Sequence, residues 1–292
     1  MLIKKCSFKN NSTSFLNSLN LSLIVVDYDN SFITYYMLTS FLSLPNSNLA
    51  NIYVLINKQN QYIYLLEELA EKNKNINLIY NYNSILLKDY NENMNPFNRG
   101  SYNHSLSLQY LINNYVFTEN VLICDNDIIF KNTFNIEYFI NELNNYDIIS
   151  NVIDLDYQTK YIIENYFKAN TYELIDKNLN IYTYMLENKQ LKIYGRFDPF
   201  CIFFKTKILK ENTIIDSIDD ISCLPDDYIK NTNKNNFIHC DTFGKLTTKI
   251  LKNNYKIKPS TYEIYGSVRH FGNASCTGIN NKDFYYNSFV LS

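Results

Sequence analysis

The sequence predicts an α/β protein in which a largely parallel sheet is covered by helices. One observation predicts this fold class, and a second predicts that the chain forms one domain. Short apolar runs alternate with segments of helical apolar spacing through the first half of the chain, and this alternation builds parallel sheets. No linker and no internal repeat divides the 292 residues, so we expect one continuous domain.

The expected elements follow from the periodicity of the apolar residues. A buried strand at 21–26 leads to a helix at 32–44, which stops at Pro45 because proline cannot continue a helix. Further strands are expected at 52–56, 76–80, 121–124, 148–153 and 201–205. Further helices are expected at 62–70, 101–115, 136–143, 157–191 and 241–251.

The composition argues against nucleic-acid binding and favours a reduced compartment. A net charge of −2 and a pI near 6.0 leave no surplus of Lys and Arg for neutralising phosphates. The six cysteines form no CxxC pair, which favours reduced thiols in a cytoplasmic protein. The first ten residues lack the continuous apolar run of a secretory signal, and polar residues interrupt every apolar run, so we expect a cytoplasmic protein, with association at the inner face of a membrane as an open alternative.

Two carboxylates stand immediately after an apolar run in the middle of the chain. Asp125 and Asp127 follow the strand expected at 121–124, where their charge is unfavourable unless something compensates it. A divalent cation that bridges to a diphosphate would do so. Ligands of such sheets lie beyond the carboxyl ends of the strands, and this pair is expected at such an end. We therefore predict a cation site here.

Two other Asp-x-Asp pairs compete with this one. Asp154 and Asp156 head a helix-like segment, where such side chains commonly cap a helix. Asp27 and Asp29 follow the first strand in the run LIVVDYDNS, which resembles the nucleophile motif of haloacid-dehalogenase-type phosphatases. In that family the first Asp attacks a phosphate. The motif lacks the usual Gly after the second Asp, and a phosphatase that uses Asp27 is the alternative function.

Most of the chain resembles the GT-A glycosyltransferases, in particular the family 2-like group. The likeness is carried by VVDYDN at 25–30, Asn57 after the second strand, NPFNRGSYN at 95–103, LICDND at 122–127, FDPFCIFFK at 197–205 and IHCDT at 238–242. It implies one GT-A, Rossmann-like domain with a mixed, mostly parallel sheet. About 1–130 would bind a nucleotide-sugar, and about 131–292 would bind the acceptor.

The resemblance also implies the metal ligands and the nucleotide pocket. Mn²⁺ or Mg²⁺ would be held by Asp125 and Asp127, with His270 completing the metal shell. The residues expected to line the nucleotide-sugar pocket are Asp27, Tyr28, Asn57, Arg99 and Asp125. Asn57 stands where the family usually has Asp and can hydrogen-bond a uracil edge, so a UDP-sugar is the favoured donor.

Other residues have both a functional and a structural interpretation. Asp241 would be the catalytic base by resemblance, or the N-cap of the helix that follows. Arg99 precedes the helix expected at 101–115 and would meet the nucleotide or lie on the surface, and Arg269 could neutralise a diphosphate. His104 and His239 are expected to be structural or surface residues.

The activity that the resemblance implies is metal-dependent transfer of a sugar from a nucleotide-diphosphate donor to a hydroxyl of a glycan or glycolipid acceptor. The transfer would invert the anomeric centre. Two alternatives stay open: the phosphatase, and a nucleotide-sugar-binding module that performs no chemistry.

Overall fold

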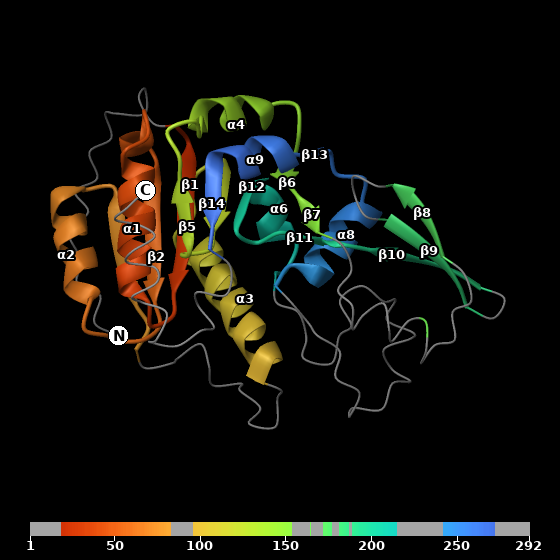
Figure 1. The fold of residues 1–292 in the computed structure, drawn as a ribbon, viewed down its shortest axis with the longest axis horizontal. Helices are drawn as coiled ribbons and strands as arrows, with labels where there is room; N and C mark the ends of the chain where they lie inside the picture. Colours follow the sequence, from red (N-terminus) through yellow and green to blue (C-terminus); the bar gives the residue numbers. More distant parts are fainter. Residues whose placement is uncertain are drawn as a thin grey trace.

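The computed structural model describes residues 19–82, 96–153, 164, 172–176, 181–186, 189–214 and 242–271 (Figure 1). Their main feature is a seven-stranded sheet in the order β13-β6-β12-β4-β1-β2-β3. The strands are β1 (Leu21–Asp27), β2 (Asn51–Ile56), β3 (Ile76–Tyr80), β4 (Asn120–Cys124), β6 (Ile148–Ser150), β12 (Cys201–Lys205) and β13 (Ile257–Pro259). Only β12 runs antiparallel to its neighbours within this sheet, which confirms the mixed, mostly parallel α/β fold.

Helices cover both faces of the sheet. They are α1 (Ser31–Leu42), α2 (Ile63–Lys72), α3 (Pro96–Asn114), α4 (Ile136–Glu142), α6 (Thr206–Glu211), α8 (Gly244–Lys252) and α9 (Thr261–Ser267), with a 3₁₀ turn at Ser47–Leu49. Successive strand side chains point to opposite faces, so Leu23 and Val25 pack with α1, α2, α4 and α9. Ile24 and Val26 pack with α3, α6 and α8. Burial on both faces explains why the central strands are continuously apolar.

Three smaller sheets complete the described structure. A β14 (Val268–His270) strand pairs antiparallel with β5 (Ile128–Phe130), and β11 (Arg196–Phe197) pairs with β7 (Val152–Ile153). The expected strand at 148–153 is therefore divided at Asn151, because its two halves join different sheets. A meander of β8 (Tyr172–Asp176), β9 (Ile181–Leu186) and β10 (Lys189–Tyr194) extends from the main sheet on the side away from α2 (Figure 1).

Two sequence-based expectations are corrected by these elements. The helix expected at 157–191 is wrong for the described residues from 172 onward, which form β8, β9 and the start of β10. Aromatic and β-branched residues follow one another from Ile181 to Tyr184, which favours a strand, and Tyr182, Thr183 and Tyr184 are buried while Met185 is exposed. The helix expected to begin at 101 begins at Pro96, since proline suits the first helical position. Arg99 consequently lies within α3 and not before it.

No helix in the described ranges is both long and apolar enough to cross a lipid bilayer.

Candidate functional site

The candidate site lies at the carboxyl edge of the sheet, where parallel strands β1, β2 and β4 end side by side. Asp27 ends β1, Asn57 follows β2 and Asp125 follows β4. Backbone hydrogen bonds continue past the strand ends, since the N–H of Asn57 donates to the Asp27 carbonyl at 2.9 Å. The N–H of Asp125 donates to the Phe200 carbonyl at 3.2 Å, which ties the start of the Asp-x-Asp turn to the segment before β12. The edge is the place where ligands of such sheets bind.

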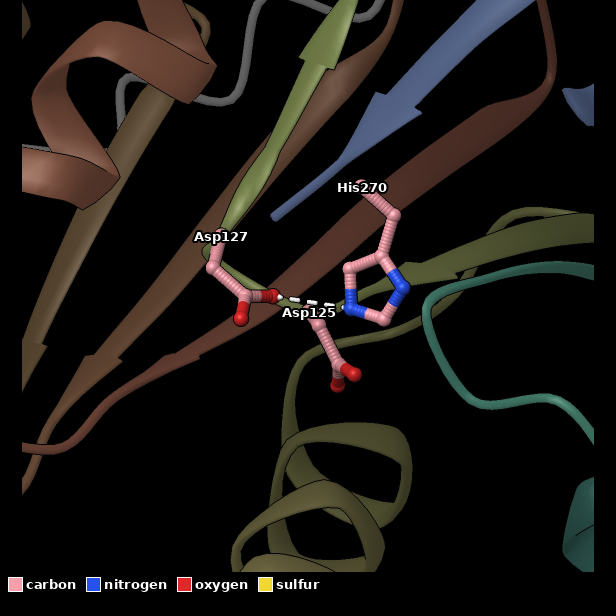
Figure 2. A group of neighbouring side chains, drawn as sticks. All are labelled: Asp125, Asp127 and His270. Carbon is pink, nitrogen blue, oxygen red and sulfur yellow. Dashed lines mark ion pairs between the residues drawn. The ribbon is translucent and has the colours of Figure 1, made fainter. Parts of the chain in front are cut away.

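Asp125, Asp127 and His270 come together at this edge. One potential ligand atom from each lies within 4.8 Å of the others, and Oδ1 of Asp127 is 3.3 Å from Nε2 of His270. Figure 2 shows the imidazole of His270, from β14, turned toward the two carboxylates of the turn between β4 and β5. Two carboxylates and an imidazole form a donor set that fits Mn²⁺, and the carboxylates also suit Mg²⁺.

The β5–β14 pairing holds His270 in place. His270 is opposite Ile128 in the ladder, and the N–H of Phe271 donates to the Asp127 carbonyl at 3.0 Å. The imidazole also stacks on Phe200, with ring centroids 4.8 Å apart and an interplanar angle of 10°. Two separate segments therefore fix the ring: β5 through the backbone of β14, and the segment before β12 through the ring of Phe200.

The middle residue of the turn is anchored as well. Asn126 is buried, and its amide nitrogen donates to Oγ1 of Thr34 on α1 at 3.1 Å. The turn that carries the two carboxylates is thus fixed to a helix on one face of the sheet, which limits how far those carboxylates can move apart.

Burial and charge act in opposite directions on His270. Its pKa is raised above the usual value: burial lowers it, but the hydrogen bond and charge of Asp127 and the charges of Asp125 and Asp198 raise it by more. The Asp127 residue is only 3% exposed, so its charge faces the imidazole instead of water. The same charges that attract the imidazolium would attract a metal cation, which binds only the neutral ring.

Asp27 is positioned differently from the nucleophile that the phosphatase alternative needs. Its side chain is fully buried, and it accepts hydrogen bonds from the N–H of Asn30 at 2.8 Å and the hydroxyl of Ser31 at 2.5 Å. Burial raises its pKa to about 6, although the bonds from Ser31 and Asn30 oppose this. Asp29 is exposed and pairs with Lys58. In this structure the carboxylate is therefore not accessible from solvent, and its oxygens are engaged by Asn30 and Ser31.

Two residues expected in the nucleotide pocket lie at the same edge. Tyr28 is 50% exposed beside the carboxyl end of β1, so its ring is available to a ligand. Asn57 is half-buried, donates to Oγ of Ser107 at 3.0 Å and accepts from Asn81 at 2.7 Å. An asparagine amide has two hydrogens and two lone pairs, so one of each is left for a nucleobase edge.

Several expected residues lie outside what the structure describes. Asp241, His239, Asp154 and Asp156 belong to ranges without a described placement, and nothing is described of the Arg99 side chain. The helix expected from 241 begins at Gly244, with Phe243 at its cap position in a left-handed conformation of φ 71°. The cap position expected for Asp241 is therefore held by Phe243.

His104 contacts the site, although the sequence predicted a structural or surface role. Its Nε2 lies 3.8 Å from Oδ1 of Asp125, and its Nδ1 lies 3.2 Å from Oγ1 of Thr242. A sequence signal for this existed, because His104 is four residues before Leu108 and so shares the helix face that packs on the sheet. Arg269 was expected to act at the site, but it precedes His270 on β14, so its side chain leaves the strand on the opposite face. Its guanidinium lies over the ring of Phe271, 4.7 Å from the ring centroid.

Neither a protein-family model nor a curated protein matches the sequence. Among solved structures, the chain is similar to a mannosyltransferase from Pyrobaculum calidifontis in complex with GDP-Man and Mn²⁺. The two sequences are 10% identical and the TM-score is 0.42, and the match covers 82% of this chain and 54% of the mannosyltransferase. It is similar to the glycosyltransferase GlyE of Streptococcus pneumoniae, with 13% identity, a TM-score of 0.46 and coverage of 94% and 61%.

A third similar structure is a 4-diphosphocytidyl-2C-methyl-D-erythritol synthase from Anaerococcus prevotii, with 12% identity, a TM-score of 0.42 and coverage of 93% and 96%. This chain thus spans only 54% and 61% of the two glycosyltransferases named above. Identities and TM-scores at this level leave the activity to be inferred from the residues of the chain itself.

Proposed function

We propose that this chain is a metal-dependent glycosyltransferase that moves a sugar from a nucleotide-diphosphate donor to a hydroxyl of a glycan or glycolipid acceptor. The observation that carries the proposal is the grouping of Asp125, Asp127 and His270 at the carboxyl edge of a mostly parallel sheet. A solvated turn or a helix cap would need neither the buried Asp127 nor the imidazole that a distant strand brings to it.

The three residues would hold Mn²⁺ or Mg²⁺, which when bound supplies positive charge to a departing nucleoside diphosphate. The protein's part is to hold the His270 ring in the correct orientation, so that its neutral form can bind once the cation replaces the proton. Stacking on Phe200 fixes the plane of its ring, and the backbone bond from Phe271 to Asp127 fixes its distance from the carboxylates. Arranging these groups before the ligand arrives avoids reorganisation during the reaction.

The remaining roles are extensions of the same proposal. Tyr28, Asn57 and Arg99 would line the nucleotide pocket, where the residual hydrogen-bonding capacity of Asn57 favours a UDP-sugar. The buried Asp27, also expected there from the sequence, would support the pocket from beneath through its bonds to Asn30 and Ser31. Asp241 would take the proton of the acceptor hydroxyl as its oxygen bonds to the anomeric carbon. The bond from that carbon to the diphosphate oxygen breaks as the new bond forms on the opposite face, which inverts the centre.

The test compares two isosteric variants, Asp127→Asn and Asp27→Asn, in two assays. One assay measures release of nucleoside diphosphate from UDP-, GDP- and CMP-sugars with Mn²⁺, and the other measures phosphate release from small phosphoesters. We expect Asp127→Asn to lose the first activity by at least about 100-fold, since it removes a ligand and its charge. We expect no phosphoesterase activity in any variant.

Two outcomes would contradict the proposal. Phosphoesterase activity that Asp27→Asn abolishes and Asp127→Asn leaves intact would establish the phosphatase alternative. Binding of a nucleotide-sugar that depends on Mn²⁺, with neither hydrolysis nor transfer for any donor and acceptor, would establish a binding module.

A further inference from the structure

We propose that His104 is a positioning residue that orients the Asp125 carboxylate and connects it to the segment before α8. This inference rests on the proposed function, because it concerns the way in which a metal ligand is held. His104 is outside the group of described residues whose ligand atoms lie within 4.8 Å of one another, so it would act on the cation through Asp125.

The two ring nitrogens of His104 face two different partners. Nε2 lies 3.8 Å from Oδ1 of Asp125, and Nδ1 lies 3.2 Å from Oγ1 of Thr242. An ionised carboxylate can only accept, so the favourable neutral tautomer carries its hydrogen on Nε2. Nδ1 then accepts from the Thr242 hydroxyl. The hydroxyl selects the tautomer, and the tautomer directs its N–H toward the carboxylate 3.8 Å away, an electrostatic contact that is longer than a hydrogen bond.

Both supports of the imidazole are rigid. The ring belongs to α3, whose residues Leu108 and Leu111 are fully buried against the sheet. Thr242 is 2% exposed, and Phe243 next to it is fully buried. A ring held between a packed helix and a buried hydroxyl has little freedom to turn away from Asp125.

Each of the two carboxylates of the Asp-x-Asp turn therefore has a histidine as its neighbour. Asp127 faces the imidazole of His270, and Asp125 faces the imidazole of His104. The Asp125 side chain is 26% exposed against 5% for Asp127, so Asp125 depends more on such a neighbour to restrict its rotamers. Partners that orient a ligand in this way commonly change metal affinity by about 10- to 100-fold when they are removed.

The experiment measures Mn²⁺ affinity by electron paramagnetic resonance of free Mn²⁺, without any sugar donor. It uses the full chain and the variants His104→Leu, His104→Gln, Thr242→Val and Thr242→Ser. The glutamine amide can present an N–H near the position of Nε2, and Ser keeps the hydroxyl that Val removes. The control is Asn114→Ala, in the exposed last turn of α3. Melting temperatures in EDTA verify that each variant is folded.

We expect His104→Leu to raise the dissociation constant about 10- to 100-fold, and His104→Gln to recover most of that loss. Thr242→Val should weaken binding by a smaller factor, while Thr242→Ser and Asn114→Ala should match the wild type. If the wild type binds Mn²⁺ and His104→Leu binds it equally well, the positioning role is wrong and the metal centre stands. If the wild type binds no Mn²⁺, the metal centre itself is wrong, and the proposed function fails with it.

Discussion

At the scale of single residues, burial separates the roles of the aspartates in the two Asp-x-Asp pairs that the structure describes. Asp27 is fully buried and accepts hydrogen bonds from α1, whereas Asp125 is partly exposed and Asp127 faces His270. The first arrangement stabilises a helix start, and the second concentrates negative charge where a ligand can reach it. Sequence spacing alone could not make this distinction, because all of these residues follow apolar strands.

The buried Asp27 predicts a pH dependence of stability. Its pKa is raised to about 6 in the folded protein from an ordinary 3.8, because burial penalises the charged form. The folded state therefore holds the Asp27 proton more tightly than the unfolded state does. The stability that comes from this difference is complete below pH 3.8 and is lost as the pH rises through 6. The loss is about 3 kcal/mol, since each pKa unit is worth about 1.4 kcal/mol. The wild type should therefore lose this stability between pH 4 and pH 7.5, whereas Asp27→Asn should not. The free energy of unfolding of the variant, relative to that of the wild type, should rise over this range.

Urea titrations in EDTA across this pH range measure the gain, and Asp147→Asn is the control of opposite sign. Burial acts to raise the pKa of Asp147, but the Lys256 N–H and the Lys205 ammonium lower it overall. Its contribution is present above pH 3.8 and is lost as the pH falls, so this substitution should cost most at neutral pH. A difference between Asp27→Asn and the wild type that does not change with pH would refute the assignment.

At the scale of elements, the regular α/β units were predictable and their exceptions had local physical causes. Strands β1 and β3 match the sequence prediction closely because short apolar runs between polar turn residues specify strands, whether buried throughout as β1 or half-buried at the sheet edge as β3. The described residues of 172–191 were assigned the wrong period, since their tyrosines and isoleucines fit both a helix and a strand before tertiary packing selects one. The spacing of His104 from Leu108 placed it on the packed face of α3, but which strand end that face meets depends on tertiary packing, so its contact with Asp125 was missed.

The β14 strand predicts an effect of one backbone hydrogen bond on the metal centre. Phe271→Pro removes the N–H that donates to the Asp127 carbonyl, together with the aromatic ring. Phe271→Ala removes the ring with its contacts to Arg269 and Ile33 but keeps the N–H, so it is the matched control. A backbone hydrogen bond is worth about 0.5–1.5 kcal/mol, so the proline variant should bind Mn²⁺ up to about tenfold more weakly than the alanine variant. Equal affinities, measured by calorimetry, would mean that β14 does not position His270 through this bond.

At the scale of the whole molecule, the topology accounts for the site. Parallel strands β1, β2 and β4 place the ends of three β/α units at one edge, and β14 returns a late segment of the chain to the same edge. The sequence predicted the Asp-x-Asp pair at this edge from local chemistry, while His270 was expected only through a family resemblance. The distance of 3.3 Å between His270 and Asp127 is a product of the tertiary fold.

This arrangement predicts that nucleotide and metal stabilise the protein together. A ligand that binds only the folded state at 100 times its dissociation constant adds about 2.7 kcal/mol, which corresponds to about 5 °C in melting temperature for a chain of this size. We expect a UDP-sugar with Mn²⁺ to give a shift of this order, and the same UDP-sugar in EDTA to give almost none, because the diphosphate would meet the uncompensated charge of Asp125 and Asp127. Asp127→Asn should abolish the Mn²⁺-dependent part of the shift.

Two outcomes would contradict this prediction. A shift of equal size in EDTA would mean that the nucleotide binds without the metal centre. A shift with GDP- or CMP-sugars alone would overturn the uracil preference inferred from Asn57.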